Sequence, residues 1–358
     1  MTNQNNAIRF YNGEQIPVEL HKVRIVQKLF LKPIEERKAA MEKAGFNTFL
    51  LSTKDIFLDM LTDSGTNAMS DNQISSMLQA DDAYAGSQSF YRMEEALRDV
   101  FGKHYVLPVH QGRAAENIVS QVFIKKGDVI PMNYHFTTTK EHMELNGGKV
   151  LEIYADDALE IKSDKPFKGN IDIDKLKAVF DEYGKEKVAF VRMEASTNLI
   201  GGQPFSMQNM RDVKKICEEN GTMMVLDASL IGENAYFIKQ REEEFKDTDI
   251  KDILLEMCEY SDLVYFSSRK VSSTRGGGIV TNSEDLYLKM RDLLVLYEGF
   301  LTYGGMSVRE IEAMAVGINE TCDETIIGQS PSFIAYAVTE LDKAGIPVIT
   351  PPGALGCH

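Results

Sequence analysis

From about residue 90, short apolar segments alternate with helical patterns, and this alternation restricts the possible folds more than any other feature of the chain. The apolar segments predict strands, and the amphipathic segments between them predict helices. Strands are expected at 105–109, 129–132, 149–154, 188–193, 222–227 and 263–266. Helices are expected at 113–123, 139–145 and 250–260, and from about residue 207. Strands that alternate with helices form a mostly parallel sheet with helices on its faces, which predicts an α/β fold.

Ligands of open parallel sheets bind at the carboxyl ends of the strands, so the residues after each strand matter most. After the apolar run 263–266 come Ser267, Ser268, Arg269 and Lys270, and then three glycines at 276–278. An isolated lysine at such a place is usually solvated. If it is desolvated and lies near other cations, its pKa falls and the free amine can attack a carbonyl cofactor.

Two other strands are followed directly by the first turn of a helix. His110-Gln111-Gly112-Arg113 opens a helix, where free N–H groups and the helix dipole favour an anion such as phosphate. The alternative is a plain turn with a surface arginine. Farther along, Phe136 can stack on a planar ring and Thr137 can supply a hydroxyl group. The alternative here is a core aromatic residue followed by a helix-capping threonine.

Two polar residues end the next strands. Asn198 can donate to a ring hydroxyl or bond its own turn. Asp227 ends the strand 222–227, and a buried carboxylate needs a cation or a donor. A protonated pyridine nitrogen and an arginine are both possible partners. Two strands joined by one helical crossover would bring Asp227 and Lys270 to one pocket. Together, these strand ends favour a pyridoxal phosphate enzyme.

Composition narrows the other possibilities. Charged residues make up 26% of the 358 residues and hydrophobic residues 43%, as in ordinary globular proteins. The net charge of −15 argues against a nucleic-acid or an anionic membrane partner. The four cysteines show no zinc or disulfide spacing, and the N-terminus is polar without a signal-peptide pattern. We therefore expect a soluble cytoplasmic protein that acts on a small molecule.

Seven collinear motifs between about residues 55 and 316 resemble the β-eliminating lyase family, the tyrosine phenol-lyases and tryptophanases of fold-type I pyridoxal phosphate enzymes. They are LTDSGTNAMSD (61–71), DDAYAGSQSFY (81–91), HQGRAAEN (110–117), FTTT (136–139), TNLIGGQP (197–204), LDAS with ENAYFIKQRE (226–242), and YEGFLTYGG (297–305). NAMSD and FTTT favour the tyrosine phenol-lyase branch, whereas YFIKQREEEFKD (236–247) is closer to tryptophanase.

The resemblance implies a role for each matched residue. Lys270 would form the Schiff base with the cofactor and later move the α-proton. Asp227 would pair with the pyridinium nitrogen, and Phe136 would stack on the ring. Asn198 would bond the 3-hydroxyl. The phosphate-binding set would be Gln111, Gly112, Arg113, Ser267 and Arg269.

The same resemblance implies the substrate side of the site. Tyr84 would protonate the leaving group across a subunit interface, which implies a homo-oligomer with shared sites, and Thr62 would lie close by. Thr137 would meet the hydroxyl group of a phenolic substrate.

Two positions depart from the family pattern. Leu230 stands where the family has an arginine that pairs with the cofactor's phenolic oxygen. The family's monovalent-cation (K⁺) site falls on Gly65 and Asp82, with Arg275 in place of an asparagine. The hypothesis is that the Arg275 guanidinium takes the place of the cation and pairs with Asp82.

The domain pattern is expected to be incomplete. Residues 1–57 would form an N-terminal arm and part of a small domain, and 58–316 the large cofactor domain. Residues 317–358 would form a connecting helix and the start of a truncated small α+β domain. The end at Gly356-Cys357-His358 resembles the glycine-glycine-histidine at the start of the family's small domain proper. The arginine that binds the substrate carboxylate lies beyond this point in the family, so the chain is expected to be a fragment, to need a second chain, or to have a remodelled site.

The leading functional expectation is a carbon–carbon β-lyase for an aromatic L-amino acid. It would convert tyrosine to phenol, or tryptophan to indole, with pyruvate and ammonia. One alternative is a pyridoxal phosphate enzyme of another outcome, such as a carbon–sulfur β-lyase or an aminotransferase. The other is a non-catalytic subunit that needs a partner chain.

Overall fold

The computed structural model describes residues 7–18, 22, 28–59 and 68–356. The chain divides into two compact units, one formed by Met1–Glu19 and Asn67–His358 and the other by Leu20–Thr66. The smaller unit contains the helix α1 (Ile34–Lys43) and two short 3₁₀ turns, η1 (Thr48–Leu50) and η2 (Thr53–Asp55). Within it, Lys32 forms an ion pair with Asp55.

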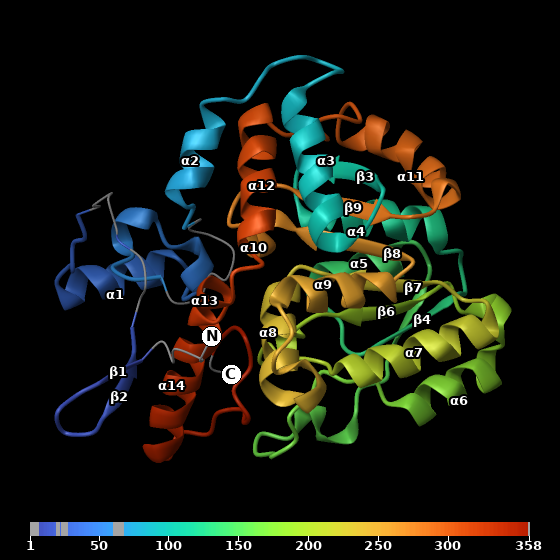
Figure 1. The fold of residues 1–358 in the computed structure, drawn as a ribbon. Helices are drawn as coiled ribbons and strands as arrows, with labels where there is room; N and C mark the ends of the chain where they lie inside the picture. Colours follow the sequence, from blue (N-terminus) through green and yellow to red (C-terminus); the bar gives the residue numbers. More distant parts are fainter. Residues whose placement is uncertain (1–6, 19–21, 23–27, 60–67, 357–358) are drawn as a thin grey trace. The chain divides into compact units, whose positions relative to one another are not determined.

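A seven-stranded sheet organises the larger unit (Figure 1). Its order is β3 (Tyr105–Val109), β9 (Gly277–Thr281), β8 (Leu263–Ser267), β7 (Met224–Asp227), β6 (Val191–Glu194), β4 (Val129–Met132) and β5 (Lys149–Glu152). Strand β9 runs antiparallel to both of its neighbours, and the remaining pairs are parallel. The carboxyl ends of β3, β4, β6, β7 and β8 therefore lie at one edge, as the sequence predicts.

Helices cover both faces of this sheet. Alternate residues of one strand enter different cores, as Tyr265 and Phe266 of β8 show. The face that contains Tyr265 packs against α4 (Gly112–Phe123), α5 (Thr137–Leu145) and α11 (Glu284–Tyr297). The opposite face packs against α3 (Gln88–Phe101), α6 (Ile173–Tyr183), α7 (Met207–Asn220), α8 (Ile231–Arg241), α9 (Ile250–Glu259) and α12 (Val308–Glu320).

Helix α3 shows how the sequence specifies this packing. Met93, Ala96, Leu97 and Val100 follow the three- and four-residue spacing of one helix face, and all four are buried. Each fully buried large apolar side chain contributes about 1.5–3 kcal/mol relative to an exposed one. The helix ends at Gly102, whose φ of 63° is the left-handed conformation that favours glycine.

Further elements complete the larger unit. They are the hairpin β1 (Ala7–Arg9) and β2 (Gln15–Pro17), the helices α2 (Asp71–Met77), α10 (Ser268–Val271), α13 (Glu324–Ile327) and α14 (Gln329–Lys343), and the turns η3 (Asp156–Leu159), η4 (Lys185–Lys187), η5 (Asn198–Ile200) and η6 (Glu243–Phe245). In the described part of the chain, no helix is long and apolar enough to cross a membrane.

The structure confirms the α/β fold and corrects three details. Strand β5 ends at Glu152, and β6 spans Val191–Glu194 instead of 188–193. Two helices, α8 and α9, connect β7 to β8, where one was expected. Strand β9 was not predicted, because two glycines begin it. A Cβ atom at Gly277 would lie 2.5 Å from the carbonyl oxygen of Phe266, so glycine is what allows β9 to pair with β8.

Candidate active site

Lys270 lies beside Phe136, although the two residues come from different strand ends. Strand β8 ends at Ser267, and the short helix α10 then carries Lys270. Phe136 follows β4 and is the N-cap residue of α5. The Nζ atom of Lys270 is 5.1 Å from the centroid of the Phe136 ring. The lysine and the aromatic residue that the sequence singles out therefore border the same space.

The start of α4 approaches the end of β8 so closely that only glycine fits between them. A Cβ atom on Gly112 would lie 2.9 Å from the Cβ atom of Ser267. The free N–H groups at the start of α4 therefore meet the β8 end, in the geometry that binds anions. Beside Ser267, the Nε atom of Arg269 is buried and has no hydrogen-bond partner among the described residues. An unpaired buried guanidinium donor is costly unless an acceptor such as a phosphate oxygen reaches it.

Gln111 is held by residues that the sequence analysis did not single out. Its side-chain amide lies 2.8 Å from His110 Nε2. The other ring nitrogen of His110 contacts Glu298, and the backbone N–H of His110 donates to Glu298 Oε2 at 3.0 Å. Arg113 is exposed near α5, where burial and the Arg113 charge lower the pKa of His142. Of the predicted phosphate-binding set, Gln111 and Gly112 lie at the start of α4 and Ser267 adjoins it, while Arg269 follows in α10.

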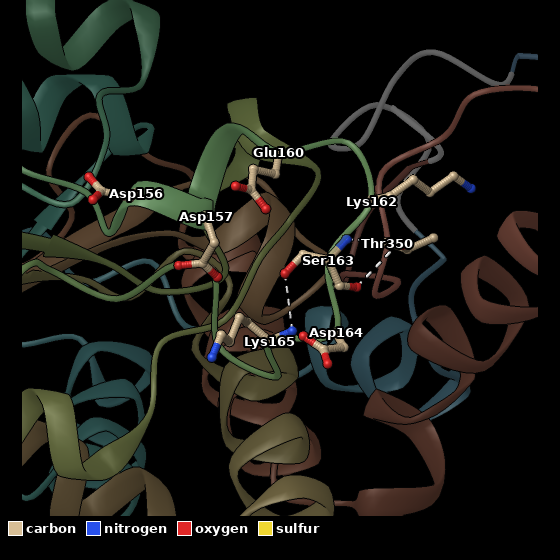
Figure 2. A pocket seen from close by; sticks show the side chains of 8 residues that line it. All are labelled: Asp156, Asp157, Glu160, Lys162, Ser163, Asp164, Lys165 and Thr350. Atoms are coloured by element: carbon tan, nitrogen blue, oxygen red, sulfur yellow. Dashed lines mark hydrogen bonds between the residues drawn. The ribbon is translucent and has the colours of Figure 1, made fainter.

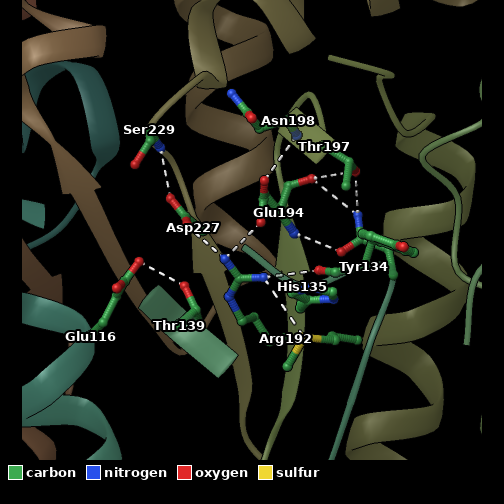
Figure 3. A network of polar contacts seen from close by, with 12 residues as sticks. Glu116, Tyr134, His135, Thr139, Arg192, Glu194, Thr197, Asn198, Asp227 and Ser229 are labelled. Atoms are coloured by element: carbon green, nitrogen blue, oxygen red, sulfur yellow. Dashed lines mark hydrogen bonds and ion pairs between the residues drawn. The ribbon is translucent and has the colours of Figure 1, made fainter. Parts of the chain in front are cut away.

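Asp227 ends β7 at the centre of a buried polar network (Figure 3). Its Oδ2 atom accepts from Arg192 Nη2 at 2.7 Å, and its Oδ1 atom accepts from the Ser229 N–H at 3.0 Å. The same Arg192 nitrogen donates to Glu194 Oε2 at 2.9 Å. Arg192 Nε donates to the hydroxyl oxygen of Tyr265 at 2.7 Å. An arginine is therefore a partner of Asp227, which was one of the two possibilities left open by the sequence.

Glu194 links this network to Asn198. The Glu194 Oε1 atom accepts from the Asn198 N–H at 3.0 Å, so the carboxylate fixes the start of η5. Asn133 holds the same loop, because its amide donates to the carbonyl oxygens of Glu194 and Gly169, each at 3.0 Å. The loop that carries Asn198 is consequently tied to two neighbouring strand ends.

Burial dominates the electrostatics of the site. Burial alone would lower the pKa of Arg192, but Tyr265, Glu194 and Asp227 raise it well above its usual value. Burial also raises the pKa of Glu194, although Arg192 opposes that shift. On α8, burial raises the pKa of Glu233 to about 7, against the nearby charge of Lys270.

Glu116 is a buried residue of α4 that contacts the start of α5. It accepts hydrogen bonds from the Thr138 and Thr139 hydroxyl groups, both at 2.6 Å. Burial raises its pKa, as does the nearby charge of Asp227, whereas the two threonine donors lower it. This contact ties the start of α5 to α4 and so helps to position Phe136 and Thr137.

Two predicted substrate-side residues are exposed in this chain. Tyr84 has 69% of its surface exposed, and its ring stacks on Phe300 with 5.1 Å between centroids. Tyr303 lies 5.7 Å away in an edge-on arrangement and raises the pKa of Tyr84 through a hydrogen bond and its charge. Thr137 is the first residue of α5 and is exposed. Thr62 lies outside the described residues.

The predicted cation site stays a prediction. Gly65 lies outside the described residues. Asp82 and Arg275 are both exposed, and no ion pair joins them within this chain among the residues that the structure covers. In the same described part, no group of three or more His, Cys, Asp or Glu side chains is arranged to hold a metal ion. Leu230 is buried, with 3% exposure, and brings no charge to the site.

A separate surface hollow contains none of the predicted site residues (Figure 2). Acidic and basic side chains line it, among them Asp157, Glu160 and Lys165, together with Thr350. Neither Lys270 nor Asp227 lines it, and we assign it no role in the chemistry.

Arg192, Glu194 and Tyr265 were missed by the sequence analysis, although a signal was present. The segment Val188–Met193 is apolar except for Arg192, and Glu194 follows directly. A charged residue inside a buried strand requires a partner of opposite charge. That requirement would have pointed to an ion pair within reach of the Asp227 strand end.

The fold and these strand ends define a fold-type I enzyme that uses pyridoxal phosphate. Among solved structures, a threonine aldolase from Leishmania major aligns with a TM-score of 0.61 at 16% identity, covering 83% of this chain and 82% of its own. A serine palmitoyltransferase from Sphingomonas wittichii aligns with a TM-score of 0.60 at 14% identity, covering 90% of this chain and 79% of its own. At these identities the similarity establishes the shared fold.

Sequence comparison then defines the family. The model of the beta-eliminating lyases matches residues 59–355. Tyrosine phenol-lyase from Pasteurella multocida is 44% identical over 94% of this chain and 74% of its own length. Tyrosine phenol-lyase from Symbiobacterium sp. is 43% identical over 94% of this chain and 73% of its own length. The chain belongs to the beta-eliminating lyase family and is a pyridoxal-phosphate-dependent lyase.

The close contact at Gly112 gives a first prediction. We expect Gly112→Ala to push α4 away from Ser267, because its new Cβ atom would have to occupy space 2.9 Å from another carbon. The cost should be about 1–3 kcal/mol of folding stability, with a weaker hold on pyridoxal phosphate. Thermal unfolding and cofactor retention during dialysis would measure both. Gly86→Ala is the matched control, since a Cβ atom at that position would meet nothing within 4 Å. If both variants unfold at the same temperature and retain the cofactor equally, the close contact at Gly112 does not support the phosphate site.

Proposed function

We propose that this chain cleaves L-tyrosine with water to phenol, pyruvate and ammonia. The observation that carries the proposal is the identity of 40–44% to several tyrosine phenol-lyases, over 94% or more of the chain. The exposed Thr137 follows Phe136, whose ring lies beside Lys270, and supports a phenolic substrate because its hydroxyl group can bond a ring hydroxyl. We also infer that the protein works in the cytoplasm and that residues 58–316 form its cofactor domain.

The residues would divide the work as follows. Pyridoxal phosphate, when bound, supplies an electron sink for the charge that remains after the substrate α-carbon loses its proton. Lys270 Nζ holds the cofactor and then takes that proton. Asp227 keeps the ring nitrogen protonated, and Phe136 stacks on the ring. Asn198 orients it through the 3-hydroxyl.

The remaining residues would bind the phosphate and the leaving group. The phosphate would sit at the start of α4, where the buried Arg269 Nε lacks a protein acceptor among the described residues. Gln111, Gly112, Arg113 and Ser267 would surround it. Tyr84 would hand a proton to the departing phenol carbon.

Substrate choice tests the proposed reaction. We expect pyruvate release from L-tyrosine to exceed that from L-tryptophan. Thr137→Val should lower kcat/KM for tyrosine by about 10-fold, the size of one hydrogen bond to a partly charged hydroxyl. The same variant should leave S-methyl-L-cysteine almost unaffected, and this internal control has no ring hydroxyl. Pyruvate from S-methyl-L-cysteine but none from tyrosine would favour the carbon–sulfur lyase alternative.

The exposure of Tyr84 leads us to propose a homo-oligomer in which Tyr84 serves the Lys270 of a neighbouring subunit. Two inactive variants, Tyr84→Phe and Lys270→Ala, should then complement each other when they are mixed. Random pairing would return about a quarter of the wild-type rate, because half of the dimers would be mixed and each would hold one intact site. A mixture that stays inactive after verified subunit exchange would rule out the shared site.

For the cation site, we propose that Arg275 takes the place of the monovalent cation and meets Asp82 of a neighbouring subunit. Asp82 and Arg275 are both exposed in the single chain, so each can reach a neighbouring subunit. Activity that requires added K⁺ would contradict it.

A further inference from the structure

The buried network behind Asp227 contains a complete ion pair that the proposed chemistry does not use. Arg192 is fully buried, and Glu194 is 4% exposed. Glu194, Asp227 and Tyr265 stand side by side in the register of β6, β7 and β8. Arg192 lies two residues before Glu194 in the same strand and therefore on the same face of the sheet. Its side chain reaches along that face to all three residues. Figure 3 shows its contacts with Glu194 and Asp227.

Every nitrogen of the Arg192 guanidinium has a partner. Nε donates to Tyr265, and Nη1 donates to the carbonyl oxygen of Tyr134 at 3.2 Å. Nη2 is shared between Glu194 and Asp227. The planar group is thus fixed in one orientation, with one nitrogen directed at the Asp227 carboxylate.

The charges decide what this arrangement does to Asp227. Arg192 alone would neutralise Asp227 and weaken its attraction for a protonated ring nitrogen. Glu194 supplies the counter-charge, so the three groups together keep one net negative charge. Without Arg192, Glu194 and Asp227 would be neighbouring buried carboxylates, and such a pair retains a proton.

We propose that Arg192 and Glu194 form a positioning pair that sets the charge and orientation of Asp227 for the pyridine nitrogen of the cofactor. Arg192 fixes the Oδ2 atom of Asp227, and the Ser229 N–H fixes the Oδ1 atom. Glu194 keeps the arginine from cancelling the aspartate charge. This inference rests on the proposed role of Asp227.

Cofactor affinity of the apo protein measures the pair directly. We expect Arg192→Met to weaken the binding of pyridoxal phosphate by roughly 10- to 100-fold, the range for a hydrogen bond to a charged group. Glu194→Gln should fold well, because Arg192 keeps Asp227 as its partner, and should also weaken binding. In the double variant Arg192→Met/Glu194→Gln, Asp227 is a lone anion again. The affinity of the double variant for pyridoxal phosphate should be within about 3-fold of wild type, since replacing both members of a buried pair is often nearly neutral.

A cofactor analogue separates this role from a merely structural one. In the analogue, a CH group replaces the ring nitrogen, so nothing remains for Asp227 to pair with. We expect Arg192→Met and Glu194→Gln to bind the analogue as wild type does. The midpoint of the pH titration of bound pyridoxal phosphate, followed by its absorption, should shift in both single variants. In the double variant it should be the same as in wild type.

Two reference variants complete the test. Arg211→Met removes another arginine held by two carboxylates, Glu244 and Glu256, and should change stability but not cofactor affinity. Asp227→Asn should weaken pyridoxal phosphate but not the analogue, which checks the role on which the inference rests. Suppose that Asp227→Asn weakens pyridoxal phosphate but not the analogue, while the Arg192 and Glu194 variants bind pyridoxal phosphate as wild type does. The positioning pair is then refuted, and the proposed role of Asp227 stands. Equal losses for pyridoxal phosphate and the analogue in the Arg192 and Glu194 variants would refute the positioning pair as well.

Discussion

Lys270→Ala is expected to lower pyruvate release by about 10⁴-fold or more, because it removes the group that we propose both holds the cofactor and takes the α-proton. The protein should remain folded, since Lys270 is partly exposed on the short helix α10 and its aliphatic chain adds little to the core. The absorption of bound pyridoxal phosphate should change from that of a protein-linked cofactor to that of the free aldehyde.

Lys270→Arg is the control for this prediction. It keeps a positive charge at a position whose Nζ atom lies 5.1 Å from the Phe136 ring in wild type, but the guanidinium does not deprotonate and cannot attack the cofactor. We expect it to be as inactive as Lys270→Ala while it retains more cofactor. Substantial activity in either variant would overturn the assignment of Lys270.

Asp227→Asn is expected to lower kcat/KM by roughly 10²- to 10³-fold, the usual cost of losing a preorganised electrostatic partner. The ring nitrogen would lose its anionic partner and would no longer stay protonated. Steady-state pyruvate release gives kcat/KM, and titration of the apo protein gives the affinity for pyridoxal phosphate. Activity within a few-fold of wild type would show that Asp227 has only a structural role.

The structure also predicts what Asp227→Asn does not do. Arg192 would keep Glu194 as its counter-charge, and the asparagine oxygen can still accept from the Ser229 N–H. The thermal unfolding temperature should therefore change little. Arg192→Met differs in this respect, because it leaves the Glu194 and Asp227 carboxylates buried without their cation. It should destabilise the fold by about 3–5 kcal/mol, the usual cost of breaking a buried ion pair.

The sequence predicts which residues lie at the site because the end of a strand can be recognised from neighbouring residues alone. Apolar runs and the residues that follow them place Lys270, Asp227 and Phe136 at one sheet edge without knowledge of the strand order. Strand β9 could not be predicted in this way, since its glycines are weak strand formers by themselves. They are favoured only by the close approach of Phe266, which is a tertiary contact.

The partner of Asp227 shows the other limit. A carboxylate at a strand end is equally compatible with a pyridine nitrogen and with an arginine, and the sequence alone does not decide. The structure shows that Arg192 donates to one oxygen of the carboxylate, and the pairing of Asp227 with the cofactor nitrogen stays a proposal. The charged residues of β6 were the available clue, but their role depends on which strand lies next to β7.

The position of β9 has a consequence for how the protein matures. The residues proposed to bind the phosphate fall into two groups. Residues 111–113 follow β3, Ser267 and Arg269 lie at and just after the end of β8, and β9 separates these strands in the sheet. In the folded protein, β9, which is the last of the seven strands in the sequence, lies between β3 and β8 and pairs with both. The pairing of β9 with β8 is local, whereas its pairing with β3 is non-local and is expected to form more slowly than a helix. We therefore expect cofactor capture to require the pairing of β9 with β3, so that a nascent chain stalled before Gly277 should acquire no colour.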